Sequence, residues 1–468
     1  MAAHVESQRI AADYDVLILG GGCAGLACYE ALRAQDLRCA IVESKAFLGG
    51  RVRGFAGAEH HDAGAAWVHG ASPANPQVAL AAAAGVAVAE AFPANPWCRP
   101  ALFRSRAAFY RGGARVGAAD VAAGGALHAA VTRRVEARAA AAVAAGDAAA
   151  TLAGALDYGG ASGAAAFVAR AHGTMMELWM GASARELQLR EFGAPAGDDA
   201  LCGDFPGAHG LPRGGMRGVL EPLVAAVPAA ARLLGRRCVA VRTGAAGVRV
   251  ETLGGDAYAC RACVVALPLG VLRDAPPTFD PPLPAAKARA IARLGVGAYA
   301  KVLLRFERRW WRDGDDDVAP GFLVLEDGDD VVVCFDDGSD DCALEATFAG
   351  DAARACDAAR HGRRVARVLA ALERATGEAP PPPVAAHTTD WTNDPDARGA
   401  YSFWPAGAGD ADVDDLAAPV DGRLFFAGEA TSVEYQGSMA GALLSGARAA
   451  AEVLDAARGE RALEHLRI

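Results

Sequence analysis

The chain has 468 residues, is 53% hydrophobic and carries a formal net charge of −10 at pH 7. This length predicts two domains with separate cores. The negative charge argues against nucleic acid as a partner, although it is compatible with a cationic small molecule. Much of the hydrophobic fraction is alanine, and no run of about eighteen strongly apolar residues indicates a membrane span.

The eleven cysteines are scattered, and the one CxxC pattern, Cys260 to Cys263, has no second pair to complete a zinc site. We therefore expect no metal site and a reduced intracellular compartment, most simply the cytoplasm. The N-terminal MAAHVESQRIAADYD lacks the apolar core of a secretory signal. The C-terminal Leu466-Arg-Ile468 is not a clear peroxisomal signal, so the peroxisome stays open as an alternative. The oligomeric state cannot be predicted.

The first element reads as a strand that turns into a helix, in the segment DVLILGGGCAGL from Asp15 to Leu26. Its turn contains Gly20-x-Gly22-x-x-Gly25, with Cys23 and Ala24 opening the helix. The next apolar strand ends at Glu43, about twenty residues further on. Such glycines let the backbone approach a pyrophosphate at the helix N-terminus, and the acid binds ribose hydroxyls. This segment therefore predicts a dinucleotide site.

The remaining elements predict an α/β fold in which two domains are interleaved. The stretch from Gln77 to about Gly210 reads as alanine-rich helices, and acidic clusters such as Asp336–Asp341 read as solvated turns. Strands are expected at 238–241, 248–252, 263–267, 300–306, 321–325, 331–335 and 424–427, and helices at about 360–376 and 438–458. We assign 1–76, 211–284 and 421–468 to a Rossmann-like dinucleotide-binding domain, and 77–210 and 285–420 to a substrate domain built on a mixed β-sheet flanked by helices.

Seven ordered segments together resemble the flavin-dependent amine oxidase family, which includes monoamine oxidases, polyamine oxidases and flavin-type histone demethylases. They are Asp15–Phe55, Asp62–Pro76, Pro212–Leu220, Val264–Leu272, Leu294–Trp311, Trp391–Gly407 and Arg423–Leu454. The last of them contains RLFFAGEATS. The resemblance implies FAD as the cofactor. It also implies that the chain returns to its first domain to complete the flavin site.

The resemblance assigns further residues to the cofactor. Arg51 follows the glycines Gly49 and Gly50 and can donate to a phosphate, while Lys45 stands where the family usually has arginine. Glu429 resembles the acid at the ribityl–phosphate region. The remaining cofactor assignments are Ala65, Ala66 and Trp67 along the flavin ring, Cys238, Gly428, and Ser438 and Met439 at the start of the last helix. Ala400 stands where monoamine oxidases carry the cysteine that bonds to the flavin, so FAD is expected to be non-covalent.

Lys301 and Tyr401 are the expected catalytic residues, together with His69. Lys301 interrupts the apolar strand YAKVLLRF and resembles the family lysine that holds a water near flavin N5. Tyr401 matches one wall of the aromatic cage that attracts a cationic amine, whereas Ser438 stands where monoamine oxidases have the second wall. Core packing is the alternative for Tyr401, and a solvent-reaching lysine is the alternative for Lys301.

Asp62 and His69 point to a polyamine substrate. The stretch GAAWVHG with Asn75-Pro76 resembles polyamine oxidases, in which these two positions line a substrate tunnel. A carboxylate there favours a distal ammonium, and a histidine can hydrogen-bond an amine. Capping of a turn is the alternative for Asp62, and a satisfied core position is the alternative for His69.

The expected reaction is the oxidation of a polyamine or acetylated polyamine, with hydride transfer to the flavin and reoxidation by O2 to hydrogen peroxide. A monoamine or L-amino-acid oxidase is the first alternative. A histone demethylase is less favoured because about fourteen residues precede the first strand and no long helical insertion is evident. A flavin-binding scaffold without turnover is the alternative outside the enzymes.

Overall fold

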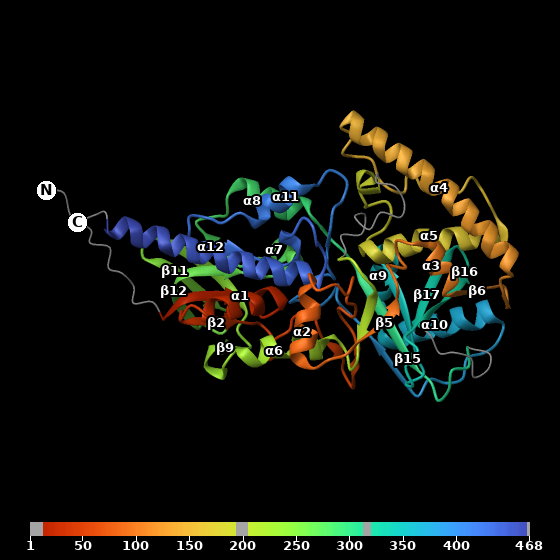
Figure 1. The fold of residues 1–468 in the computed structure, drawn as a ribbon, viewed down its shortest axis with the longest axis horizontal. Helices are drawn as coiled ribbons and strands as arrows, with labels where there is room; N and C mark the ends of the chain where they lie inside the picture. Colours follow the sequence, from red (N-terminus) through yellow and green to blue (C-terminus); the bar gives the residue numbers. More distant parts are fainter. Residues whose placement is uncertain (1–12, 193–204, 312–319, 466–468) are drawn as a thin grey trace.

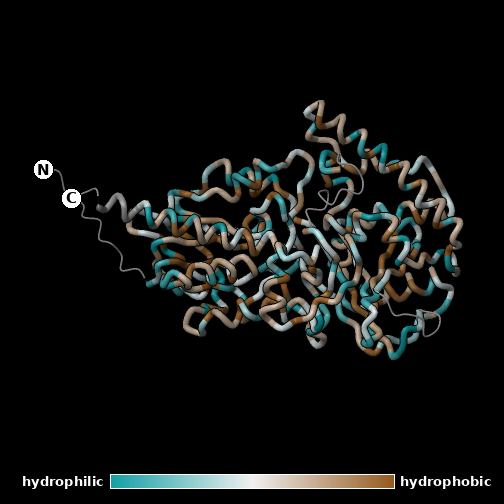
Figure 2. The backbone as a smooth tube through the Cα atoms, viewed as in Figure 1, coloured by the Kyte–Doolittle hydropathy of each residue, from teal (hydrophilic) through white to brown (hydrophobic). Residues whose placement is uncertain are grey.

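The computed structural model describes residues 13–192, 205–311 and 320–465. Figure 1 shows two lobes side by side, each built around its own β-sheet and crossed by the chain more than once. In the described part, no helix is long and apolar enough to cross a membrane. In Figure 2, hydrophilic positions are interspersed among hydrophobic ones in the two longest helices, α4 (Ala118–Ala145) and α12 (Met439–His465).

The first lobe contains an eight-stranded sheet in the order β13-β10-β11-β12-β1-β2-β9, with β21 also paired to β12. Its parallel part joins β21, β12, β1, β2 and β9, and its antiparallel part is the β10-β11-β12 meander. The strands are β1 (Tyr14–Leu19), β2 (Cys39–Val42), β9 (Arg232–Leu233), β10 (Cys238–Gly244), β11 (Gly247–Thr252), β12 (Ala257–Val265), β13 (Thr278–Asp280) and β21 (Leu424–Phe426). The sheet therefore combines segments from the beginning, the middle and the end of the chain.

Helices α1 (Cys23–Arg33) and α12 lie against each other on this sheet. Their close approach depends on Gly446, because a Cβ there would lie 2.1 Å from the carbonyl oxygen of Ala24. The other helices of the lobe are α2 (Pro76–Ala84), α6 (Met216–Ala226), α7 (Leu269–Asp274), α8 (Ala285–Arg293) and α11 (Asp410–Ala417).

The second lobe contains a seven-stranded sheet in the order β19-β15-β18-β17-β16-β6-β7. All its pairs are antiparallel except β16 with β6. The strands are β6 (Ala107–Arg111), β7 (Ala114–Arg115), β15 (Tyr299–Arg305), β16 (Gly321–Asp327), β17 (Asp330–Asp336), β18 (Ala343–Ala349) and β19 (Ala385–Thr388). Its helices are α3 (Pro100–Ser105), α4, α5 (Gly163–Met180), α9 (Gly350–Asp357) and α10 (His361–Thr376).

Three further pairings of the described chain involve two strands each. Strands β3 (Gly54–Phe55) and β4 (Ala58–Asp62) form a hairpin, and β5 (Val88–Phe92) pairs with β8 (His209–Pro212). Strands β14 (Gly295–Val296) and β20 (Ser402–Phe403) pair near the middle of the molecule.

The predicted fold class is confirmed, since a mixed α/β structure with several sheets is observed. Two details differ from expectation. The stretch 77–210 is not wholly helical, because β6 and β7 extend the second sheet, β6 pairing in parallel with β16. Asp336 is fully buried rather than solvated, and its carboxylate accepts hydrogen bonds from the indole of Trp311 and the N–H of Gly338. These partners compensate its lost hydration.

The cysteines also differ in part from the uniformly reduced set that was expected. Among the cysteines that the structure describes, nine are free thiols, but Cys98 is disulfide-bonded. Burial raises the pKa of Cys23 to about 12, which keeps this thiol neutral beside the β1–α1 turn.

Candidate active site

A cavity of about 700 Å³ lies between the two lobes and gathers most of the predicted site residues. It extends from the β1–α1 turn to Lys301 on β15 and reaches the aromatic side chains of the helical region. The predicted residues that line it are Gly20, Gly22, Cys23, Ala24, Glu43, Lys45, Gly50, Arg51, Ala65, Ala66, Trp67, His69, Cys238, Lys301, Tyr401, Gly428, Glu429, Ser438 and Met439. Residues that are up to about four hundred positions apart in the sequence thus line one cavity.

The β1–α1 turn leaves a row of backbone donors at one end of the cavity. Gly20 has φ = 102°, a left-handed conformation that glycine adopts without strain. Helix α1 starts after Gly22 with no side-chain cap and no acidic residue in its first turn. Its first N–H groups therefore stay available to an anion. Gly25 does not line the cavity; a Cβ there would lie 2.0 Å from the oxygen of Gly20, so its role is to let helix and turn pack closely.

Glu43 and Lys45 lie beside this turn. The Glu43 carboxylate accepts hydrogen bonds from Gly21 N at 2.7 Å and Lys45 N at 2.8 Å, which fixes its position at the end of β2. The Lys45 ammonium is 3.0 Å from Asp394 and 3.2 Å from Asp396. Lys45 therefore joins the segment around Asp394 to the dinucleotide-binding region, a pairing that sequence did not indicate.

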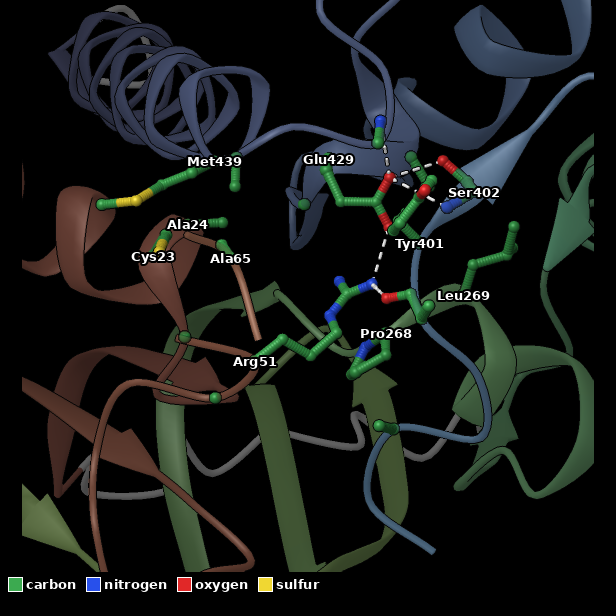
Figure 3. A pocket seen from close by; sticks show the side chains of 18 of the residues that line it. Cys23, Ala24, Arg51, Ala65, Pro268, Leu269, Tyr401, Ser402, Glu429 and Met439 are labelled. Atoms are coloured by element: carbon green, nitrogen blue, oxygen red, sulfur yellow. Dashed lines mark hydrogen bonds and ion pairs between the residues drawn. The ribbon is translucent and has the colours of Figure 1, made fainter. Parts of the chain in front are cut away.

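Arg51 and Glu429 form an ion pair in the middle of the cavity (Figure 3). Arg51 Nη1 donates to Glu429 Oε1 at 2.9 Å and to the carbonyl of Ala400 at 2.6 Å. The other Glu429 oxygen accepts from Ser402 Oγ at 2.5 Å and from Gly437 N at 3.0 Å. This one carboxylate joins three segments that are far apart in the sequence.

Helix α12 starts at the cavity with Ser438 as its cap. Ser438 Oγ accepts from Gly441 N at 2.9 Å and donates to the carbonyl of Tyr435 at 2.7 Å. Figure 3 shows Met439 close to Cys23 and Ala24 of α1, so two helix N-termini approach the same cavity. Both ends favour negative charge.

Lys301 is buried, with 7% of its surface exposed. Its ammonium donates to the carbonyl of Asp62 at 2.8 Å and to that of Gly64 at 3.3 Å. It also lies 3.3 Å from the carboxylate of Glu345, which lines the cavity from the neighbouring strand β18. Burial raises the pKa of Glu345, while the charge of Lys301 opposes that rise. The pair places a charged donor inside an otherwise apolar part of the cavity.

Aromatic side chains line the part of the cavity next to His69. The ring of His69 lies 4.8 Å from Trp179 and 6.1 Å from Trp97, both nearly perpendicular to it, and 6.4 Å from Trp67. His69 Nδ1 is 3.1 Å from His209 Nδ1. Burial, with a smaller effect of His209, holds the pKa of His69 well below its usual value, so this imidazole is neutral.

Tyr401 also lines the cavity, and backbone carbonyls hold its hydroxyl. The hydroxyl donates toward the carbonyls of Leu178 at 3.1 Å and Trp179 at 3.3 Å. Its ring centroid lies 6.1 Å from that of Tyr299. Because the hydroxyl is occupied, the ring is what Tyr401 offers to a ligand.

The position of Asp62 does not agree with the predicted tunnel role. Both carboxylate oxygens lie 3.0 Å from Met216 N, the first residue of α6, and the side chain does not line the cavity. A negative charge at a helix N-terminus is stabilised by the helix dipole. Asp62 thus caps α6, and only its backbone carbonyl reaches Lys301.

This position gives Asp62 a pH-dependent effect on stability. Burial raises its pKa to about 7, against the opposing effects of Met216 N and Lys301. Between about pH 4 and pH 7, the folded protein keeps a proton on Asp62 that the unfolded chain has already released. The contribution of Asp62 to the free energy of unfolding is therefore fully present below about pH 4 and is lost as the pH rises through about 7. We expect Asp62→Asn to remove this pH dependence. Between about pH 5 and about pH 8, the free energy of unfolding of the wild type should fall by about 1–3 kcal/mol relative to that of the variant.

Thermal unfolding of both proteins at a series of pH values measures this difference. Asp421→Asn is the matched control, since Asp421 is exposed. Parallel curves for the wild type and Asp62→Asn would show that Asp62 titrates normally.

Sequence reasoning missed several lining residues. Glu345 could have been found from the sequence, because it is an acid within the apolar strand ALEATFA, just as Lys301 is a base within an apolar strand. Trp97 and Trp179 lie outside the seven segments that resemble the family, so no motif marked them. The same holds for His209, which does not line the cavity but contacts His69. Trp391 donates to the carbonyl of Ala63 at 3.0 Å and thereby supports the loop that follows β4.

Comparison with known proteins assigns the class. The sequence profile of the flavin containing amine oxidoreductases matches residues 23–454. The chain belongs to this family of oxidoreductases.

Individual relatives fall in two groups. The chain is 28% identical to polyamine oxidase 2 of Arabidopsis thaliana over 475 residues, which cover 93% of this chain and 87% of that protein. It is 33% identical to lysine-specific histone demethylase 1 homolog 3 of the same plant over 285 residues, or 58% of this chain. The match spans 17% of that demethylase and 26% of demethylase homolog 1.

Solved structures agree with the fold. A putrescine oxidase bound to putrescine superposes with a TM-score of 0.71 over 94% of this chain and 99% of that one, at 21% sequence identity. This similarity shows the fold of a flavin amine oxidase.

Proposed function

We propose that this protein is an FAD-dependent oxidase of a secondary amine in a polyamine or acetylated polyamine, with O2 as the electron acceptor. The products are an aldehyde, a shorter amine and hydrogen peroxide. The observation that supports this most strongly is the position of Lys301, whose buried ammonium lies in the same cavity as the dinucleotide turn and the aromatic residues around His69.

The donor set of the cavity fits FAD. Glu43 would bind the adenosine ribose, the N-terminus of α1 the pyrophosphate, and Arg51 with Glu429 the ribityl region. Ala65 to Trp67 and the start of α12 would contact the ring system. When bound, the flavin supplies a two-electron acceptor for the hydride of the carbon next to the amine nitrogen.

FAD is expected to be held without a covalent bond, because Ala400 has no nucleophilic atom near the cavity and burial keeps Cys23 protonated. Acid precipitation of the purified protein should release all its yellow colour into the supernatant. Colour that stays with the precipitated protein would contradict this expectation.

The substrate class follows from the aromatic end of the cavity. The faces of Trp67, Trp97 and Trp179 suit the methylene chain and the cationic nitrogens of a linear polyamine. The neutral imidazole of His69 can form a hydrogen bond with the amine nitrogen and thereby orient it in the cavity. Glu345 adds a negative charge next to Lys301.

Lys301 has a separate task in this proposal. Its ammonium donates to two carbonyl groups of the loop after β4 and lies next to Glu345, so a water molecule would bind it in place of one of these contacts. With the flavin bound, the ammonium would supply a positive charge in the same cavity. That charge favours transfer of electrons to oxygen, and the water serves for hydrolysis of the imine product.

Demethylation of an N-methyl-lysine peptide is a second candidate, supported by the 33–37% identity to plant histone demethylases over about half of the chain. The bond broken is again that between a secondary amine nitrogen and its carbon. The two candidates differ in the substrate that the cavity must admit.

A panel of amines tests both candidates. Purified, flavin-loaded protein is given spermine, spermidine, their N-acetyl forms, a simple monoamine, L-amino acids and a methylated histone peptide, with hydrogen peroxide and formaldehyde measured. We expect peroxide with the polyamines. Formaldehyde with the peptide alone would favour the demethylase, turnover restricted to monoamines or amino acids would favour those oxidases, and no turnover at all would favour a flavin-binding scaffold.

A further inference from the structure

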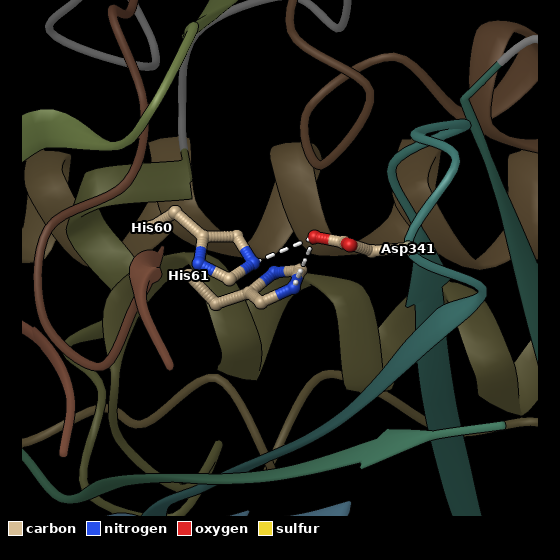
Figure 4. A group of neighbouring side chains, drawn as sticks. All are labelled: His60, His61 and Asp341. Carbon is tan, nitrogen blue, oxygen red and sulfur yellow. Dashed lines mark hydrogen bonds and ion pairs between the residues drawn. The ribbon is translucent and has the colours of Figure 1, made fainter. Parts of the chain in front are cut away.

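Three side chains outside the active site converge where the hairpin β3–β4 meets the second sheet. They are His60 and His61 of β4, and Asp341 of the turn between β17 and β18 (Figure 4). One ligand atom from each side chain lies within 4.8 Å of the others. The histidines and the aspartate are 280 residues apart in the chain, so the fold alone brings them together.

Both imidazoles face one oxygen of the aspartate. His60 Nε2 is 2.6 Å and His61 Nε2 is 3.2 Å from Asp341 Oδ2. Neighbouring side chains of a regular strand point to opposite faces, yet these two rings lie with their centroids 4.4 Å apart. His61 Nε2 is buried and makes no hydrogen bond, so its one polar contact is the aspartate oxygen of the cluster.

The second oxygen of Asp341 is held separately. Arg305 Nη2 lies 3.7 Å from Asp341 Oδ1. Such an outer contact orients a carboxylate while its other oxygen stays free to bind. The surrounding backbone is also fixed, because Phe55, Ala58, Leu303 and Ala343 pack in one buried cluster next to the three side chains.

We propose that His60, His61 and Asp341 bind a divalent transition-metal ion, with Zn²⁺ as the ion best matched. Two imidazole nitrogens and one carboxylate oxygen are a common ligand set for zinc, with water in the fourth position. Ligand atoms of a tetrahedral zinc site lie about 3.3 Å apart at the usual bond lengths, close to the His61–Asp341 separation. His60 is half exposed, which gives an ion a route from solvent.

A bound ion joins the hairpin to the turn before β18. The strand β4 ends at Asp62, whose carbonyl accepts a hydrogen bond from Lys301, and β18 carries Glu345. The metal therefore ties together the two segments that hold the Lys301–Glu345 pair. Its binding is independent of the substrate proposed above.

The test uses tag-free, flavin-loaded protein dialysed against a chelator and titrated calorimetrically with Zn²⁺ alone. We expect one ion per chain and a Tm about 2–4 °C higher at saturation. Single variants His61→Gln and Asp341→Asn should each weaken binding by about 10-fold or more. His387→Gln and Asp340→Asn serve as controls, since His387 packs on Phe55 outside the cluster and Asp340 is an exposed neighbour of Asp341.

The flavin spectrum shows whether each variant is folded, and Co²⁺ absorption of the wild type gives a second measurement that needs no variant. A visible Co²⁺ band of nitrogen–oxygen coordination that Zn²⁺ abolishes supports the site. No binding of Zn²⁺ by the wild type, or equal binding by wild type, His61→Gln and Asp341→Asn, would overturn the proposal.

Discussion

Glu429→Ala is expected to remove the flavin from the protein. Glu429 is 5% exposed, and its carboxylate pairs with the charge of Arg51. It also accepts hydrogen bonds from the hydroxyl of Ser402 and the N–H of Gly437. Removing one member of a buried ion pair costs about 3–5 kcal/mol. If that cost falls on the flavin-bound form, affinity for FAD drops by about 100-fold or more. Flavin content after purification and titration of the flavin-free protein with FAD measure this loss.

Two further variants separate charge from folding. Glu429→Gln keeps the shape of the side chain but loses its charge, so we expect an intermediate affinity. Asp421→Asn changes an exposed carboxylate of the same segment and should bind FAD like the wild type. A Glu429→Ala protein with a full complement of flavin would refute the role that we assign to this residue.

Lys301→Met is expected to keep the flavin and lose turnover. The substitution preserves the length of the side chain but removes the ammonium that contacts Asp62, Gly64 and Glu345. Positioned proton-transfer groups typically contribute about 100-fold or more, and we expect a decrease of that order in kcat. Rapid mixing can assign this decrease to one half-reaction. The role proposed for Lys301 predicts that reoxidation of the flavin by O2 slows more than its reduction by the amine.

Removal of Lys301 also leaves Glu345 buried without its partner, which costs stability. The double variant Lys301→Met with Glu345→Gln should therefore be more stable than Lys301→Met while staying slow. Lys287→Met is the control for loss of a buried ammonium: Lys287 donates to the carbonyls of Asp415 and Leu416 and does not line the cavity. Normal reoxidation in Lys301→Met would exclude Lys301 from the oxidative step.

The fold and the cofactor region could be predicted because short local patterns carry them. A strand, a glycine turn and an acid at the next strand are dictated by the geometry of one β-α-β unit. RLFFAGEATS likewise stays together in space, where β21 leads to Glu429 and the start of α12. Lys301 was recognisable because the segment around it resembles the family segment that carries a lysine, whereas the lysine alone would equally suit an edge strand that reaches solvent.

The substrate side could not be predicted to the same degree, because it is assembled from distant segments. Asp62 had the expected residue type, but its direction depends on α6, which begins more than a hundred and fifty residues later. Trp97 and Trp179 meet only in the folded protein, where α5 packs onto β17 and β18 and Trp179 at its end reaches Trp97. The cluster of His60, His61 and Asp341 was missed for the same reason, since no local spacing joins its members.

Anaerobic mixing of the flavin-loaded protein with spermidine or N-acetylspermine tests the central claim most directly, that this cavity transfers electrons from an amine to a bound flavin. We expect the oxidised flavin spectrum to bleach in a single turnover, and admission of O2 to restore it with one equivalent of peroxide. A flavin that stays oxidised with every amine of the panel would contradict the assignment as an amine oxidase.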